Sequence, residues 1–182
     1  MRKKLKKAVI IGVSSGIGKA LARELVRNNY NVGVTGRRES HLLVLQKEHP
    51  EHIHIAVFDT TKSNTIEQLG ALEKTSEGID LFIISAGIGH INLDYNYSLE
   101  NETNQLNVIA FTQLVNWRMR YFEKQGQGHL VNTSSVASRK GGRQAPAYNA
   151  SKAYQSIYLE GTTQKVATIN CQFTPLMFDP VL

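Results

Sequence analysis

Short apolar runs alternate with longer stretches of helical periodicity through most of this 182-residue chain. Strands that are apolar throughout and separated by helices indicate a parallel sheet covered on both faces. We therefore expect an α/β fold of three layers, α/β/α. The expected strands occupy residues 7–12, 31–35, 53–58, 79–85 and 129–133. The first expected helix begins at Ile17, with Ala20, Leu21 and Leu25 on one face. The other expected helices lie around Leu42 and Leu45, around Ile66, Leu69 and Leu72, over about 99–124, and from 148 to about 164.

A chain of this length has room for one well-buried core, so we expect a single domain over residues 1–182. Right-handed crossovers between its strands give a doubly wound, Rossmann-type sheet with strand order 3-2-1-4-5-6. In such a sheet the ligand lies at the carboxyl ends of the strands, and the glycine and polar clusters of this chain follow those ends.

A glycine-rich turn joins the first strand to the first helix. Glycines at this point let the turn close tightly and let the backbone approach a pyrophosphate, while the helix start supplies free N–H donors. Glycines also serve in ordinary turns, but this position favours a dinucleotide site. The candidate residues are Gly12, Ser14, Ser15, Gly16, Ile17 and Gly18.

Two arginines, Arg37 and Arg38, follow the second strand. An acidic residue at this position is typical of NAD sites, whereas an arginine favours the 2′-phosphate of NADP. Guanidinium groups pair well with phosphate oxygens. We therefore expect NADP(H) in preference to NAD(H), with Arg37 the better candidate. A surface pair at a helix start is the alternative.

The strongest motif is Tyr148-Asn-Ala-Ser-Lys152, which predicts a tyrosine and a lysine one helical turn apart on the same face. A phenol with an ordinary pKa of about 10 is a poor acid or base at neutral pH, and a nearby ammonium favours its ionised form. Taken alone, the spacing also occurs in ordinary exposed pairs. Here Ser134 and Ser135 follow the fifth strand, and Asn107 lies in a Leu-Asn-Val sequence on the long expected helix.

Together with the glycine turn, these residues resemble the motifs of the short-chain dehydrogenase/reductase family, in the family's order. Ser135 lies thirteen residues before Tyr148, which is the register of the family's serine. The resemblance implies an oxidoreductase that interconverts a carbonyl and a secondary alcohol by hydride transfer. It also implies a tetrad of Asn107, Ser135, Tyr148 and Lys152. In that tetrad Tyr148 is the general acid in reduction and the general base in oxidation.

The same resemblance assigns further roles. Ser135 would hydrogen-bond the substrate oxygen, Tyr148 and Lys152 would also contact the cofactor, and Asn107 would support a water in the proton path. Asp59, before Thr60, matches the residue that meets the adenine ring, although a helix cap explains it equally well. Ser85, Ala86 and Gly87 match the family's Asn-Ala-Gly motif with serine replacing asparagine, and a tight turn is their alternative.

Other function classes find little support. Much of the net charge of +6 lies between Arg2 and Lys7, and we interpret it as a solvated basic lead-in, so nucleic acid is not an expected partner. No stretch is apolar enough to span a membrane, and the single cysteine, Cys171, favours a reducing cytoplasm. Surface or strand-edge positions explain His49, His52 and His54, so no metal site is expected.

Several aromatic residues remain to be placed. We expect core and helix-interface packing for Tyr95, Tyr97, Tyr121, Tyr154 and Tyr158. Trp117 and Phe122 would face either the core or a partner subunit. The second reading follows because the family resemblance implies a homodimer or homotetramer built through the helices that carry Asn107 and Tyr148.

The resemblance is good over residues 7–160 and degrades after Gly161. Residues 167–173 resemble a sixth strand, but Thr174-Pro175-Leu176 lacks the glycine of the family's Pro-Gly turn. Most of the substrate-covering segment has no counterpart, so we expect a truncated C-terminal part. A second hypothesis follows, in which the chain is a catalytically weak or inactive nucleotide-binding protein that acts as an interaction module. The expected substrate of the first hypothesis is a small carbonyl or alcohol.

Overall fold

The computed structural model describes residues 5–14, 16–76, 78–165 and 170–178. The chain divides into two compact units, which are Met1–Ser85 (the first unit) and Ala86–Leu182 (the second unit). Among the described residues, no helix is both long and apolar enough to cross a lipid bilayer.

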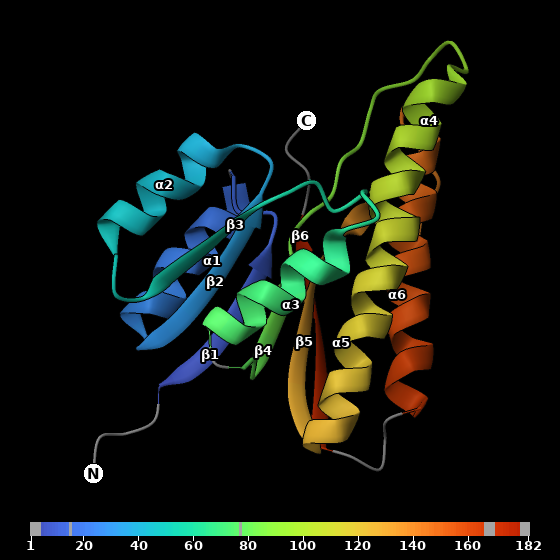
Figure 1. Ribbon diagram of the computed structural model, residues 1–182. Helices are drawn as coiled ribbons and strands as arrows, with labels where there is room; N and C mark the ends of the chain where they lie inside the picture. Colours follow the sequence, from blue (N-terminus) through green and yellow to red (C-terminus); the bar gives the residue numbers. More distant parts are fainter. Residues whose placement is uncertain (1–4, 15, 77, 166–169, 179–182) are drawn as a thin grey trace. The chain divides into compact units, whose positions relative to one another are not determined.

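The first unit is a parallel sheet with helices on both faces. Its strands pair in the order β3-β2-β1-β4, with Val9 opposite Gly33 on one side and Phe82 on the other. Figure 1 shows α1 and α2 on one face of these strands and α3 on the other. The elements are β1 (Lys6–Ile11), α1 (Gly16–Arg27), β2 (Tyr30–Gly36), α2 (Glu39–Glu48), β3 (Ile53–Val57), α3 (Thr65–Thr75) and β4 (Leu81–Ile84).

Burial in the first unit follows the predicted pattern on α2 and α3 but not on α1. Leu42 and Leu45 on α2 are buried, as are Leu69 and Leu72 on α3. The buried residues of α1 are instead Gly18, Ala22 and Val26. The predicted buried face of Ala20, Leu21 and Leu25 was therefore wrong. Gly18 lets α1 approach Gly12 closely, so the helix face that carries Gly18, and not the predicted one, is buried.

The basic lead-in also needs a correction. Lys7 lies in β1 with a buried side chain, so it is not part of a solvated segment. Its backbone N–H donates to Asp80 Oδ2 (3.0 Å), which ties the start of β1 to the residue before β4. The position of Lys7 in a central strand explains its burial, because both faces of such a strand are covered.

The second unit contains two long helical stretches and a parallel pair of strands. β5 pairs with β6 so that Leu130 lies opposite Phe173 and Asn132 opposite Pro175. Figure 1 shows α5 and α6 side by side along their length. The elements are α4 (Tyr97–Asn104), the π-helical turn η1 (Gln105–Ala110), α5 (Phe111–Gln125), β5 (Gln127–Ser135), the 3-10 turn η2 (Val136–Arg139), α6 (Pro146–Lys165) and β6 (Asn170–Phe178).

One feature separates the long predicted helix from the structure, whereas its end agrees with the prediction. It contains the π turn η1 between α4 and α5, which side-chain periodicity does not reveal. It ends at Gly126, whose φ of 75° is the left-handed conformation that glycine adopts readily at helix ends.

The Thr174-Pro175-Leu176 segment lies inside β6. The first residues of the predicted sixth strand, 167–169, lie outside the described part of the chain.

The aromatic predictions are partly wrong. Phe122 is fully buried and its ring packs over Gly128, where a side chain would collide with it, so Phe122 belongs to the core of the second unit and does not face a partner. Tyr154 and Tyr158 stack at the interface of α5 and α6, as predicted. Tyr95 and Tyr97 are 94% and 78% exposed, because they lie on the loop before α4 and at its first residue.

Candidate active site

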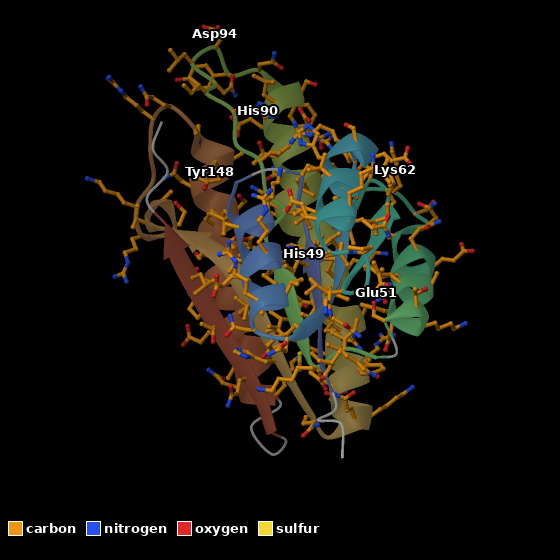
Figure 2. All side chains as sticks on the ribbon, turned by 90° about the vertical axis from the view of Figure 1, so that its left-hand side faces the viewer. His49, Glu51, Lys62, His90, Asp94 and Tyr148 are labelled. Carbon is orange, nitrogen blue, oxygen red and sulfur yellow. The ribbon has the colours of Figure 1, made fainter. Side chains whose placement is uncertain are left out.

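The four predicted catalytic residues all belong to the second unit. Tyr148 and Lys152 lie one turn apart on α6, Ser135 ends β5, and Asn107 lies on η1. Lys152 Nζ is 5.9 Å from the centroid of the Tyr148 ring. Figure 2 shows Tyr148 near one end of α6. Ser135 is buried, and its Oγ accepts a hydrogen bond from the N–H of Ala137 (3.1 Å), which caps η2.

Lys152 is held in a polar but uncharged setting. Its Nζ donates to the carbonyl oxygen of Thr133 (2.9 Å) and to Gln155 Oε1 (3.2 Å). Burial lowers the pKa of Lys152 to about 8, because removing an ammonium from water disfavours its charged form. A lysine in this state changes its charge close to physiological pH.

Asn107 uses its side chain to fix the segment that begins the second unit. Its Nδ2 donates to the carbonyl oxygen of Ile88 (2.7 Å) and to Ser151 Oγ (3.0 Å). Its Oδ1 accepts from the backbone N–H of Ile88 (3.0 Å). These bonds join Ile88 to η1 and α6, so Asn107 positions the chain beside Tyr148.

Two glycines beside Ile88 allow the predicted catalytic side chains to come close to the backbone. A Cβ at Gly87 would lie 3.3 Å from Lys152 Nζ and 3.5 Å from Asn107 Oδ1. A Cβ at Gly89 would lie 2.6 Å from Tyr148 Cδ2, which is too close for any real side chain. The structure thus places Gly87, predicted to contact the cofactor, against two tetrad residues. Gly89 was missed by the sequence analysis.

The glycine turn of the first unit fits an anionic group. Gly12 and Gly16 have φ values of 90° and 59°, and a Cβ at Gly18 would overlap the Gly12 carbonyl oxygen. The space where a Cβ at Gly16 would lie is open, and α1 begins there with no acidic residue in its first turn. Exposed N–H groups at such a helix start bind phosphate well. Ser15 lies outside the described residues.

Neighbouring residues hold this turn in place. The N–H groups of Gly12 and Val13 both donate to the Thr35 carbonyl oxygen (3.2 and 2.9 Å), and His41 Nδ1 lies 2.5 Å from the Ser14 carbonyl oxygen. Ser85 Oγ lies 3.2 Å from the position that a Cβ at Gly18 would occupy. The half-buried Ile17 lies in the first turn of α1, and Ala86 is half-buried at the start of the second unit.

Arg37 and Asp59 lie at the ends of neighbouring strands in the first unit. Arg37 is 64% exposed, and its Nη1 is 4.0 Å from Asp59 Oδ2. Burial raises the pKa of Asp59, but hydrogen bonds from Thr61 and the charges of Arg37 and Lys62 outweigh that effect and lower the pKa below its usual value. Arg38 precedes α2 at its N-cap position without a side-chain cap.

The alternative reading of Asp59 as a helix cap does not hold. Its Oδ1 accepts from the N–H and hydroxyl of Thr61 (2.9 and 2.8 Å), whereas α3 begins only at Thr65 after Asn64. Asp59 therefore fixes the turn that follows β3, next to the buried Thr60.

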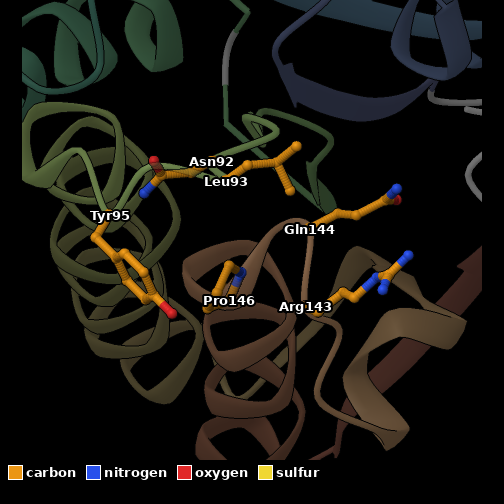
Figure 3. Close-up of a pocket in the computed structure, with 6 residues that line it drawn as sticks. All are labelled: Asn92, Leu93, Tyr95, Arg143, Gln144 and Pro146. Atoms are coloured by element: carbon orange, nitrogen blue, oxygen red, sulfur yellow. The ribbon is translucent and has the colours of Figure 1, made fainter.

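A pocket of about 350 Å³ opens beside the start of α6 in the second unit (Figure 3). Of the residues that line it, only Arg143 is charged. The loop between β4 and α4 forms one wall and also carries Gly89, which lies against the Tyr148 ring. The pocket reaches Pro146, two residues before Tyr148. Small-molecule sites have this size and mixed lining. The lining residues are Asn92, Leu93, Tyr95, Arg143, Gln144 and Pro146.

A half-buried carboxylate, also missed by the sequence analysis, connects the elements of this region. Glu100 Oε2 accepts from the N–H of Ala147 (3.0 Å), and its Oε1 accepts from Asn92 Nδ2 (2.5 Å). Asn92 N–H in turn donates to the Gln144 carbonyl oxygen (2.7 Å). These contacts join the loop after β4, helix α4 and the first turn of α6.

The histidines of the first unit make ordinary local contacts. His52 Nδ1 lies 3.1 Å from Asn31 Oδ1 on the neighbouring strand. Within the described ranges, no three histidine, cysteine or acidic residues are grouped closely enough to hold a metal ion.

Comparison with known proteins adds the following. A family model described as short chain dehydrogenase matches residues 6–174. An uncharacterized oxidoreductase of Staphylococcus haemolyticus is 28% identical over 174 residues, which cover 93% of this chain and 75% of that protein. An NADP-dependent 3-hydroxy acid dehydrogenase of Salmonella typhimurium is 27% identical over 176 residues, which cover 88% and 69%.

Solved structures share the fold. A short-chain dehydrogenase from Streptomyces avermitilis has a TM-score of 0.89 at 24% identity, covering 96% of this chain and 65% of that one. A gluconate 5-dehydrogenase from Burkholderia cenocepacia in complex with NADP and tartrate has a TM-score of 0.86 at 21% identity, covering 96% and 71%. The predicted fold class, a Rossmann-type parallel sheet of order 3-2-1-4-5-6 with helices on both faces, is confirmed.

Proposed function

Because this chain belongs to the short chain dehydrogenase family of oxidoreductases, which act on CH–OH groups, we propose that it interconverts a carbonyl and a secondary alcohol with NADP(H). The observation that carries this proposal is the pairing of Tyr148 with a buried Lys152 whose pKa is lowered to about 8. In the described part of the second unit no carboxylate forms an ion pair with Lys152, so its ammonium is available to the phenol.

The chain's own residues would handle the proton and the substrate oxygen. Tyr148 would donate its phenolic proton to the carbonyl oxygen in reduction and take it back in oxidation. Ser135 would donate a hydrogen bond to the same oxygen and stabilise the charge that develops there. Lys152 would keep a positive charge near the phenol, with Nζ 5.9 Å from the centroid of its ring. NADP(H) supplies or accepts the hydride when bound.

The cofactor would be held by residues of the first unit. The open backbone at Gly16 and the start of α1 fit a pyrophosphate, as described above, and Arg37 is exposed enough to pair with a 2′-phosphate. NADP is named for the Salmonella relative, which supports the choice over NAD.

The catalytic assignment is tested with Tyr148→Phe. We expect oxidation of NADPH across a panel of carbonyl compounds to fall at least about 100-fold, because general acid catalysis is lost. Binding of NADPH, followed by its fluorescence, should survive. Tyr97→Phe, which removes an exposed hydroxyl on α4, is the matched control. Turnover unchanged by Tyr148→Phe would show that the assignment is wrong.

The cofactor assignment is tested with Arg37→Asp. The ratio of NADP to NAD affinity should fall at least about tenfold, since a charge-assisted contact with phosphate is replaced by repulsion. Arg27→Asp, at an exposed site on α1, serves as the control for the change in net charge. An unchanged ratio would remove Arg37 from the cofactor site.

A further inference from the structure

Gln155 occupies the centre of a buried polar network in the second unit. It lies on α6, three residues after Lys152, and its side chain is fully buried. Its Oε1 accepts hydrogen bonds from Lys152 Nζ (3.2 Å) and from Asn132 Nδ2 (3.2 Å). Its Nε2 donates to the backbone carbonyl oxygen of Asn107 (2.8 Å). Both ends of this one amide are therefore engaged, and two of its contacts are with tetrad residues.

The π turn makes the contact with Asn107 possible. In an α-helix the carbonyl of Asn107 would accept from the N–H of Phe111, four residues on. Here the Phe111 N–H donates to the carbonyl oxygens of Leu106 and Val108. The Asn107 carbonyl oxygen accepts from a side chain, and Gln155 provides the donor. A buried carbonyl without a partner would be costly, so the π turn and Gln155 stabilise each other.

We propose that Gln155 is a positioning residue, a neutral bridge that fixes the Lys152 ammonium against the π turn carrying Asn107. The proposal rests on the function proposed above for Lys152 and Tyr148. Gln155 has no proposed contact with the Tyr148 hydroxyl or with the substrate oxygen. It acts through Lys152, by removing freedom from a long side chain that would otherwise have several rotamers.

The neutrality of the bridge has a chemical consequence. From β5, the groups near Lys152 Nζ are the Thr133 carbonyl and, through Gln155, Asn132. From the other elements of the second unit they are Gln155, Gly87 with Asn107, and the Tyr148 ring. Tyr148 is the one titratable side chain in this described set. A carboxylate at position 155 would add a charge partner and raise the pKa of Lys152.

Two variants separate the parts of this proposal. Gln155→Glu keeps the shape and adds a negative charge, and Gln155→Met keeps the length but removes both hydrogen-bonding ends. Gln164→Glu, on an exposed site of the same helix, is the matched control for added charge. The protonation of Lys152 is followed in the free protein by NMR of isotope-labelled lysine side chains, with Lys152→Met to assign the signal.

We expect the pKa of Lys152 to rise by at least about one unit in Gln155→Glu and the pH profile of kcat to move in the same direction. In Gln155→Met, kcat should fall about tenfold or more while KM for NADPH changes little, because Lys152 is present but poorly placed. Gln164→Glu should change none of these quantities.

The proposal is overturned if Lys152 titrates as in the parent chain in both variants and kcat is unchanged. If Gln155→Glu does not fold, as judged by circular dichroism, Gln155→Met alone tests the proposal. An unchanged kcat and an unchanged Lys152 NMR signal in that variant would show that Gln155 does not position Lys152. The NMR titration needs no substrate. It therefore still tests Gln155 if no carbonyl compound is turned over, which would count against the proposed function instead.

Discussion

The ring of Tyr148 packs against a residue without a side chain, and this contact defines where the phenol can lie. A Cβ at Gly89 would lie 2.6 Å from Cδ2, 2.8 Å from Cγ and 3.1 Å from Cβ of Tyr148. Gly89→Ala must therefore move either the tyrosine or the loop. We expect the activity assigned to Tyr148 to fall about tenfold to 100-fold, because a displacement of about 1 Å can cost this much. The rate of NADPH oxidation measures it.

A control for this change exists on α6. Gly161→Ala adds the same methyl group in a helix where nothing lies within 4 Å of the new atom, so activity should stay within about twofold of the parent. Equal effects of Gly89→Ala and Gly161→Ala would show that the contact with Tyr148 has no catalytic importance.

The lowered pKa of Lys152 predicts that the stability of the chain depends on pH. Its pKa in the folded chain is about 8, below the usual lysine value of about 10.4, so the unfolded chain binds more protons between these two values. The free energy of unfolding should therefore rise as pH increases from about 8 to about 10.4, by about 3 kcal/mol in total, with no contribution from Lys152 to the slope below pH 8.

Urea denaturation between pH 7 and 10.5 measures this effect, with Lys152→Met as the reference because other groups also titrate at alkaline pH. The difference in stability between the two chains should change over the stated range. Parallel curves would mean that Lys152 keeps its ordinary pKa in the folded chain.

Arg143 is the one charged side chain that lines the pocket beside α6. If the substrate binds there, a carboxylate on it would gain a charge-assisted hydrogen bond. Arg143→Ala should then raise KM for an acidic carbonyl substrate about tenfold, while a neutral substrate of the same length is affected little. Arg120→Ala, exposed on α5, is the control. A uniform effect on both substrates would argue against anion recognition.

At the scale of elements, the strands were predictable because their apolar runs are buried on both faces and read directly from the sequence. The placement of Tyr148 and Lys152 on one helix was predictable too, since they are separated by one helical turn, while their catalytic role stays a prediction. The π turn was not, because inserting one residue into a helix leaves no mark on local composition. Gln155 lies on the same stripe of α6 as Lys152, so helical spacing could have identified it.

The role of Glu100 could not be read from the sequence, because its contact with Ala147 spans 47 positions. Its carboxylate satisfies an N–H in the first turn of α6, where the helix dipole favours negative charge. Glu100→Ala would remove this acceptor from the Ala147 N–H and one of the two acceptors of Asn92 Nδ2, the other being the Asn96 carbonyl oxygen (3.2 Å). We expect a loss of about 1–3 kcal/mol in the free energy of unfolding, measured by urea denaturation.

The matched control is Glu160→Ala, which removes an exposed carboxylate from the same helix that Glu100 caps. Its effect should stay within about 0.5 kcal/mol. A loss for Glu100→Ala no greater than for Glu160→Ala would show that these contacts of Glu100 contribute nothing to stability.

At the scale of the whole molecule, α5 and α6 share a face on which side chains of the two helices contact one another. Thr112 Oγ1 lies 2.8 Å from the Tyr154 hydroxyl, and Asn116 Nδ2 donates to the Tyr158 hydroxyl (2.7 Å). Tyr154 and Tyr158 stack with ring centroids 5.5 Å apart. These contacts hold the two helices together, so any partner would meet a preformed surface rather than one that must order on binding.

This face also exposes apolar groups. Ile157 and Tyr154, three residues apart on α6 and therefore on one face of it, are 68% and 36% exposed, and Ile109 on η1 is 58% exposed. Exposed apolar side chains that lie together mark association sites more often than scattered ones do. Self-association through these helices, in a dimer or tetramer, is therefore our prediction for the chain in solution.

Ile157→Asp tests that prediction, since a carboxylate buried in an interface without a partner costs several kcal/mol. We expect the variant to sediment as a monomer at concentrations where the parent chain sediments as a dimer or tetramer, with an unchanged far-ultraviolet circular dichroism spectrum. Val44→Asp places the same charge on an exposed apolar site of α2 and should leave the assembly intact. A parent chain that sediments as a monomer, or a variant that assembles as the parent does, would contradict association through α5 and α6.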